Sequence, residues 1–358
     1  MKILIYGAGS QGSFLAARLH EAGQQVSLLA RGQRLADLKE HGLVVEDLFT
    51  HQRRTYAVRV VEQLSAQDNY DWVIVAMGRH HQLQALPALA ANQKVANFLF
   101  LGNNAGGSLE LCLALGIQRV VLGFLMSVGT LEGPVAYAAN QIDGKASPSQ
   151  LGELDGSPTQ RLIELAAVWE NAGLPVEICP NIDAWLKCHA ALILPLAGAY
   201  FLAGCDAGRI SRTRDILVML ARGWREAFQV LRVYRIPIIP TRLKIFIWLP
   251  EPFLITFLQR RLDNPLFAYA LLHAPKMRPE CSQLGHEISL LAHNAGIITP
   301  HLDRLILAAR SDCYNLPEGS CNLPLDWRGV WVWIGLLAAL VGLVFGLKHF
   351  PRRFSQNL

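Results

Sequence analysis

The chain has 358 residues, of which 52% are hydrophobic and 17% are charged, and its formal net charge is +5. This length suffices for two domain cores, and the low charged fraction points to membrane contact. Lysine and arginine are scattered, apart from short groups such as Arg352-Arg353, which argues against a nucleic-acid-binding protein. The seven cysteines form no C-x-x-C pair, so we expect reduced thiols in an intracellular protein.

The N-terminal segment is typical of a dinucleotide-binding unit. An apolar strand from Lys2 leads into a G-x-G-x-x-G turn, and a helix and a second strand follow. The first glycine makes the tight turn, the second lets the backbone approach a pyrophosphate, and the third allows close helix–strand packing. The helix then directs its free N–H groups toward the phosphates. The predicted cofactor-binding residues of this turn are Gly7, Ala8, Gly9, Ser10, Gln11 and Gly12.

The end of the second strand indicates which dinucleotide binds. An NAD site usually has an acid there, whereas this chain has Arg31, with Arg34 one turn later. A guanidinium suits a 2′-phosphate, so we expect NADP(H). Two solvated arginines at the start of a surface helix are the alternative.

The remaining pattern divides the chain into an α/β half and a helical half. Further buried strands are predicted at 71–77, 95–101, 120–125 and 135–138 of one parallel sheet, and apolar helices at 161–172, 184–203, 216–233 and 280–295. We therefore expect a Rossmann-type domain over 1–156, an all-helical substrate domain over 157–314 and a linker over 315–328.

The C-terminal region is predicted to cross a membrane. Residues 329–348 are almost free of charge, Trp327, Trp331 and Trp333 lie at their start, and a basic tail follows over 349–358. Because Met1 leads directly into a strand, we expect no signal peptide and place the catalytic domains in the cytoplasm. The basic tail also favours the cytoplasmic side, and a single span cannot satisfy both preferences.

A second apolar stretch, Leu243–Leu258, is interrupted by Pro250 and Pro252. It is too interrupted to span a bilayer, so it is interpreted as a hydrophobic lid or a membrane-facing flap. The alternative is an ordinary packed helical hairpin.

Several patches follow one another in a recognisable order along the chain. Besides the glycine turn and Arg31, they are Arg79-His80-His81-Gln82, Asn103 to Gly107, Asp183 to Lys187, and Arg278-Pro279-Glu280 leading to Ala295-Gly296-Ile297-Ile298-Thr299-Pro300. In this order the patches resemble the ketopantoate reductase (2-dehydropantoate 2-reductase) family. The resemblance extends from residue 1 to about Leu307.

The resemblance implies the catalytic roles. Lys187 matches the family's general acid, Glu280 the glutamate that binds the substrate hydroxyl or positions that lysine, and Asn104 an asparagine near the nicotinamide. Arg79 matches a lysine near the cofactor. Each residue also has an interpretation without a function. Lys187 is then a surface lysine, and Glu280 an acid at the start of a helix. Asn104 is then a turn residue, and Arg79 the polar end of a strand.

Two further side chains are candidates for these catalytic roles, and one pair of histidines is not expected to bind a metal. Glu287 competes with Glu280, and His189 is a second candidate acid. His80 and His81 have no third ligand at metal spacing, so we expect no metal.

Four departures from the family pattern change the expected substrate. The family's substrate-binding Asn, Asn, Ser and Asn positions are Ala191, Pro195, Ala268 and Gly285 in this chain. A site that loses several buried hydrogen bonds loses affinity for its old ligand.

We therefore expect NADPH-dependent reduction of a 2-keto acid or related ketone, which by resemblance is ketopantoate to pantoate in pantothenate and coenzyme A synthesis. One alternative is a reductase of an apolar, membrane-derived carbonyl compound, and another is a non-catalytic NADP(H)-binding membrane sensor. The expected partners are a small keto substrate and the membrane, through 329–348. A homodimer is compatible with the sequence, which leaves the oligomeric state open.

Overall fold

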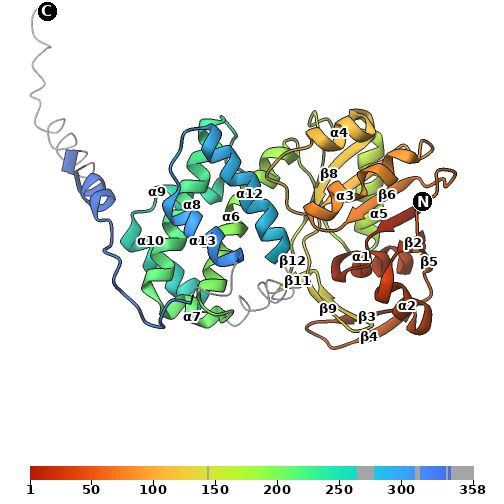
Figure 1. Cartoon of the computed structure of the whole chain (residues 1–358), viewed down its shortest axis with the longest axis horizontal. Coiled ribbons are helices and arrows are strands. Elements are labelled where there is room, and N and C mark those ends of the chain that lie inside the picture. Colours follow the sequence, from red (N-terminus) through yellow and green to blue (C-terminus); the bar gives the residue numbers. More distant parts are fainter. Residues whose placement is uncertain (143–144, 264–277, 311–314, 336–337, 340–358) are drawn as a thin grey trace, which may run out of the picture.

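The computed structural model of the chain describes residues 1–142, 145–263, 278–310, 315–335 and 338–339. It has an α/β N-terminal part and a helical C-terminal part that lie side by side, with the described C-terminal residues at the far end of the helical part (Figure 1). The α/β architecture and the helical second part were both predicted.

The N-terminal part is built on an eight-stranded sheet in the order β14-β13-β8-β7-β6-β1-β2-β5. Neighbouring strands pair in parallel except β13 with β8, which is antiparallel. The central strands are buried on both faces, which their runs of Val, Ile and Leu predict. The strands are β1 (Lys2–Tyr6), β2 (Gln25–Leu29), β5 (Arg59–Val61), β6 (Trp72–Ala76), β7 (Phe98–Leu101), β8 (Val120–Phe124), β13 (Ser149–Glu153) and β14 (Val176–Ile178).

Helices cover both faces of this sheet. On one face, α1 (Ser10–Glu21), α2 (Gly32–His41) and α5 (Gln160–Asn171) pack into one apolar core. On the other, α3 (Arg79–Ala91) and α4 (Leu109–Leu115) pack into a second core, and the short 3-10 helix η1 (Ile117–Arg119) leads from α4 into β8. The sheet is thus a doubly wound layer whose strand ends are free to form a site.

Two details of the sequence prediction are wrong. The strand expected at 135–138 does not belong to the main sheet: it is β10 (Val135–Ala139) of a separate sheet, β4-β3-β10-β9, which packs against α1. The other strands of this sheet are β3 (Leu43–Asp47), β4 (Arg53–Tyr56) and β9 (Val128–Glu132), and a short ribbon of β11 (Gln141–Ile142) and β12 (Lys145–Ala146) follows it.

The domain boundary expected at residue 156 is also too early. After α5 the chain returns to pair β14 with β13, so the N-terminal unit continues to Ile178. This strand has only three residues, Val176-Glu177-Ile178, and a partly polar pattern, which hides it in the sequence.

The helical part is organised around α6 (Ile182–Leu202), against which α8 (Arg214–Val233) and α13 (Pro300–Arg310) pack. A Cβ at Gly198 would lie 2.5 Å from the Leu305 carbonyl oxygen, so this glycine permits the close approach of α13. The other elements are α7 (Ala207–Arg212), η2 (Thr241–Lys244), α9 (Ile245–Trp248), α10 (Glu251–Leu262) and α12 (Arg278–Asn294).

Within the described residues, one helix is long and apolar enough to cross a bilayer. That helix is α6, and 67% of its apolar window is buried inside the protein, which is the environment of a core helix. The membrane helix predicted at 329–348 lies for its greater part outside the described residues, as does the basic tail at 349–358. Residues 328–335 are helical, and Trp331 and Trp333 are exposed there.

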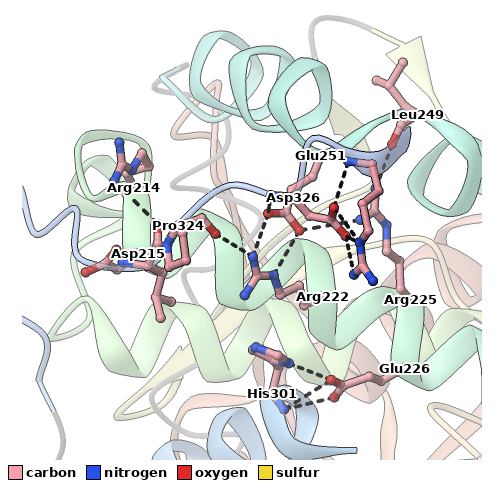
Figure 2. Close-up of polar contacts among 12 residues, drawn as sticks. Arg214, Asp215, Arg222, Arg225, Glu226, Leu249, Glu251, His301, Pro324 and Asp326 are labelled. Carbon is pink, nitrogen blue, oxygen red and sulfur yellow. Dashed lines mark hydrogen bonds and ion pairs between the residues drawn. The ribbon is translucent and has the colours of Figure 1, made fainter. Parts of the chain in front are cut away.

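The predicted linker is fastened to the helical part over residues 315–326, which we call the strap. The Asp215 carboxylate accepts backbone hydrogen bonds from Asn322 (3.0 Å) and Leu323 (2.8 Å). Further along, Arg222 donates to the Pro324 carbonyl oxygen at 2.7 Å. Figure 2 shows the contact of Arg222 with Pro324 beside the buried Glu251, whose carboxylate accepts the backbone N–H of Asp326 at 2.9 Å. The strap therefore fixes where the last described helical residues begin.

Candidate functional site

A cavity of about 520 Å³ lies where the two parts of the protein meet. Its walls come from the glycine turn after β1, the ends of β6 and β7, the segment from β8 to β10, one face of α6, and the start of α12. This is the carboxyl edge of the parallel sheet, where open α/β proteins bind their ligands.

The glycine turn has the geometry of a pyrophosphate cradle. A Cβ at Gly12 would lie 1.9 Å from the Gly7 carbonyl oxygen, and one at Gly7 (φ +121°) would lie 2.6 Å from the Ala76 carbonyl oxygen. A Cβ at Gly9, which lines the cavity, would meet no heavy atom within 4 Å. Two glycines are thus required by packing, whereas Gly9 leaves open space at the N-terminus of α1, where a phosphate binds. Ser10 and Gln11 also line the cavity, whereas Ala8, although part of the turn, does not.

The two arginines that follow β2 have different surroundings. Arg34 donates to the Ala8 carbonyl (3.0 Å), the Pro134 carbonyl (2.9 Å) and the Ser13 hydroxyl (3.0 Å), and burial lowers its pKa. It therefore ties the glycine turn to the β9–β10 turn. Arg31 is exposed and donates to the Tyr6 hydroxyl at 2.7 Å, so its guanidinium is accessible at the edge of the cofactor region.

Glu280 and Asn103 meet in the cavity wall. The Asn103 amide donates to a Glu280 carboxyl oxygen at 2.9 Å. Burial raises the pKa of Glu280, assisted by the neighbouring Glu287, and the Asn103 hydrogen bond opposes this shift. The side-chain amide oxygen of Asn103 and the Ser127 hydroxyl are buried without a partner in the described protein. Buried polar atoms without a hydrogen-bond partner in a cavity wall are available to bind a ligand.

The opposite wall is aromatic and apolar. The His189 ring stacks on Trp185 at a centroid distance of 5.0 Å and an interplanar angle of 7°, and it lies 4.3 Å from the ring of Phe124. Burial lowers the pKa of His189 to about 4, so its imidazole is neutral at pH 7. Ile193 and Ala197 continue this face of α6 along the cavity. A neutral imidazole in an aromatic stack is typical of a packing element, and the role of His189 as a second acid stays a prediction.

Lys187 and Asn104 lie together, but outside the cavity lining. The Lys187 ammonium forms an ion pair with Asp183, one turn earlier on α6, and lies 3.6 Å from the Cβ position of Gly107. The Asn104 side chain closes the turn from Asn104 to Gly107, because it donates to the Gly107 carbonyl (2.9 Å) and accepts the Gly107 N–H (2.8 Å). Of the three predicted catalytic residues, the structure brings only Glu280 into the cavity wall.

Arg79 does not line the cavity either. It is fully buried, and its guanidinium contacts the Gly107 carbonyl (2.9 Å), Glu110 (3.0 Å) and Glu287 (3.4 Å). The other Glu287 oxygen accepts the backbone N–H groups of Ala105 (3.0 Å) and Gly106 (2.8 Å). Glu287 therefore holds the loop 103–107 in place, whereas Glu280 lines the cavity.

Three of the four positions that depart from the family pattern lie in the described residues, and none of these three lines the cavity. Ala191 and Pro195 are buried in α6 and do not line the cavity, and a Cβ at Gly285 would lie 2.7 Å from an Ile306 side-chain carbon. Ala268 lies outside the described residues.

Sequence reasoning did not select Asn103, Phe124 and Ser127. Asn103 lies in the patch from Asn103 to Gly107, and it could have been identified as a candidate site residue by considering both asparagines of that turn. In the described part of the chain, no group of three His, Cys, Asp or Glu side chains is arranged to hold a metal ion.

Comparison with known proteins places these features in context. Residues 3–151 match the family model described as ketopantoate reductase PanE/ApbA. A 2-dehydropantoate 2-reductase of Mesorhizobium japonicum is 29% identical over 219 residues, which cover 52% of this chain and 63% of the relative. Another from Pyrococcus horikoshii is 25% identical over 187 residues, covering 52% and 58%. The chain therefore spans about three fifths of the length of these curated relatives.

Solved structures share the whole fold at low identity. The ternary complex of D-mandelate dehydrogenase with NADH and anilino(oxo)acetate superposes with a TM-score of 0.72 at 19% identity, covering 87% of this chain and 98% of that one. The 2-dehydropantoate 2-reductase of Geobacter metallireducens gives a TM-score of 0.70 at 18% identity, covering 86% and 99%. At these identities the likeness concerns the fold alone.

Proposed function

Because the chain belongs to the ketopantoate reductase PanE/ApbA family, we propose that it reduces a 2-keto acid or related ketone to the hydroxy compound with NADPH. One observation carries this proposal: a cavity joins the glycine turn to the partly buried carboxyl group of Glu280, whose pKa is raised. Such a carboxyl beside a dinucleotide cradle supplies the proton that a ketone reduction needs.

The residues present fit the cofactor. The open space above Gly9 and the N-terminus of α1 suit a pyrophosphate, and Arg31 suits a 2′-phosphate. When bound, NADPH supplies the hydride. The chain's own part is to hold the carbonyl group against the Glu280–Asn103 pair and to provide a proton as negative charge develops on the carbonyl oxygen.

We assign the proton donor to Glu280. Its carboxyl lines the cavity, whereas the Lys187 ammonium, which the family resemblance designates, is paired with Asp183 outside the lining. The carbonyl carbon gains the hydride, the carbonyl oxygen gains the Glu280 proton, and the carboxylate recovers its proton from solvent. Asn103 stabilises that carboxylate through its amide N–H.

Two variants separate these assignments. Glu280→Gln keeps the size of the side chain but removes the proton, so kcat is expected to fall by about 100-fold or more. Lys187→Met is expected to keep most of kcat. Wild-type kcat should also fall as pH rises through the raised pKa of Glu280, because the protonated form is the active one. A large loss of kcat in Lys187→Met with little loss in Glu280→Gln would return the role to the lysine.

The family's own reaction, ketopantoate to pantoate, is the first substrate to test. The second candidate is a bulkier, apolar carbonyl compound, which the aromatic part of the cavity wall formed by Phe124 and His189 favours. NADPH consumption by the detergent-solubilised chain, measured with ketopantoate and with a panel of keto acids and apolar ketones, distinguishes them. Binding of NADPH without turnover on the whole panel would favour the membrane sensor.

We also propose that residues 329–348 anchor the protein in a membrane with its catalytic part on the cytoplasmic side. The support is the apolar sequence itself and the exposure of Trp327, Trp331 and Trp333 at its start. Recovery of the full chain in the membrane fraction after carbonate washing tests the anchor. Release into the supernatant would contradict it.

A further inference from the structure

The outer face of α9 and α10 has an unusual composition for a water-exposed surface. Trp248 is 67% exposed, Phe253 51% and Phe257 42%. Scattered apolar residues need no explanation, but these large side chains gather on two consecutive short helices. The inner face is packed normally, since Leu254, Ile255 and Leu258 are buried against the core. One face of the segment therefore packs against the helical core, as the alternative for 243–258 expected, whereas the aromatic outer face is exposed.

The lid interpretation of this segment is not supported. None of the residues from 236 to 262 lines the cavity at the domain junction. The exposed aromatic side chains therefore need another explanation than closure over a substrate.

Basic residues border the same face. On α10, Phe253 and Phe257 share one stripe with Arg260 and Arg261, which line a shallow groove together. At the other end, Arg242 and Lys244 are exposed just before α9. In the fully described stretch 241–262 the one carboxylate, Glu251, is 1% exposed, and the next acid is Asp263. The exposed charge of this stretch is thus positive throughout.

Glu251 also fixes the orientation of α10. Its carboxylate binds Arg222 at 2.8 Å and Arg225 at 3.5 Å, both from α8, while the N–H of Asp326 donates to it at 2.9 Å (Figure 2). One buried carboxylate therefore joins α10, α8 and the strap. Such a network holds the exposed face of α10 in a constant position relative to the end of the strap.

The C-terminal segment begins at this same place. The strap ends beside Glu251, and a Cβ at Gly329 would lie 3.4 Å from the Pro250 ring, at the start of α10. Trp327, Trp331 and Trp333 are exposed there. Figure 1 shows α9, α10 and the described C-terminal residues at the end of the molecule that lies away from the N-terminal domain. About twenty further residues of the chain follow, and they contain the apolar sequence.

We propose that the outer face of α9 and α10, with Trp248, Phe253, Phe257, Arg260 and Arg261, docks on the surface of an anionic lipid bilayer. Aromatic side chains enter the headgroup region, and arginines bind anionic headgroups. The strap places this face and the terminal tryptophans at one end of the molecule, so both contact the same membrane. This inference is independent of the reductase activity.

The test places a fluorescent reporter on the proposed face of the full chain. An environment-sensitive fluorescent amino acid is incorporated at position 257, and the protein is reconstituted in nanodiscs of phosphatidylcholine with or without phosphatidylserine. A nitroxide-labelled lipid serves as the quencher. The same reporter at position 113, an exposed site on α4 in the N-terminal domain, is the control. A reporter at position 342 shows separately whether the terminal segment has entered the bilayer.

We expect quenching at position 257 in discs with phosphatidylserine and none at position 113. The double variant R260E/R261E should lose this quenching, whereas its NADPH affinity should match that of the wild type. A reporter at 257 that remains in water in both kinds of disc would overturn the proposal. A reporter at 257 that is shielded from water but is not quenched by the labelled lipid would also overturn the proposal. If that shielding depends on protein concentration, a second copy of the chain covers the face; if it does not, a segment of the same chain covers it.

Discussion

Substitution of Gly9 by alanine separates cofactor binding from folding. In the structure an added Cβ at Gly9 meets no heavy atom within 4 Å, and the backbone there (φ −68°, ψ −173°) is one that alanine adopts without strain. Replacing glycine stabilises by about 0.4–1 kcal/mol through the unfolded state, and the loss of a favourable N-cap residue costs about as much. We therefore expect a free energy of unfolding within about 0.5 kcal/mol of wild type.

The same methyl group occupies the space assigned to the pyrophosphate. NADPH affinity is expected to fall by about tenfold or more, which corresponds to about 1.4 kcal/mol. Urea unfolding without cofactor measures the first quantity, and titration of NADPH fluorescence measures the second. A Gly9→Ala protein that binds NADPH as tightly as wild type would refute the placement of the pyrophosphate.

Gly12→Ala is the matched control. Its Cβ would lie 1.9 Å from the Gly7 carbonyl oxygen, so the turn or the helix must move. Overpacking of this kind costs about 1–3 kcal/mol, and the loss should be visible in urea unfolding without any cofactor. Equal stability of Gly12→Ala and wild type would show that the turn is looser than described here.

Three further changes test other parts of the account. Arg31→Ala should weaken NADPH binding by about 10–100-fold and leave NADH binding unchanged, because a charged hydrogen bond to the 2′-phosphate is lost; equal losses for both cofactors would contradict this role. Glu287→Ala leaves Arg79 buried with one partner fewer and frees the loop 103–107, so the free energy of unfolding should fall by about 3–5 kcal/mol; a loss below about 1 kcal/mol would show that this network is not required. Glu280 binds its proton more tightly in the folded state than in the unfolded one, so the free energy of unfolding should decrease as pH rises from the ordinary glutamate range through the raised pKa. Glu280→Gln should flatten that decrease, and an unchanged pH dependence would point to another group.

The sequence was sufficient for the features that follow from local pattern. Gly7 and Gly12 have the packing roles that the motif predicts, and the long apolar helices begin and end within about two residues of their predicted limits. The apolar strands of the parallel sheet were found because both of their faces are buried. The short polar strand β14 and the second sheet were not, since their pairing depends on residues distant in the sequence.

The site itself depended on side-chain direction, which the sequence left open. Asn103 and Asn104 are adjacent in a turn, and one faces Glu280 while the other closes the turn on Gly107. Lys187 and His189 are two residues apart on α6, so they point to different sides of the helix. Because α6 is apolar nearly all round, no polar stripe in the sequence marks the side that meets the cavity. Packing against α8 and α13 decides it.

We propose that the cavity between the glycine turn and Glu280 is the site of an NADPH-dependent reduction. The most direct test of this site is NADPH consumption by the wild type and by Glu280→Gln on the same carbonyl panel, with NADPH affinity measured for both. We predict turnover on at least one carbonyl compound by the wild type, and its loss in Glu280→Gln with NADPH binding retained. Turnover that is equal in the two proteins would contradict it.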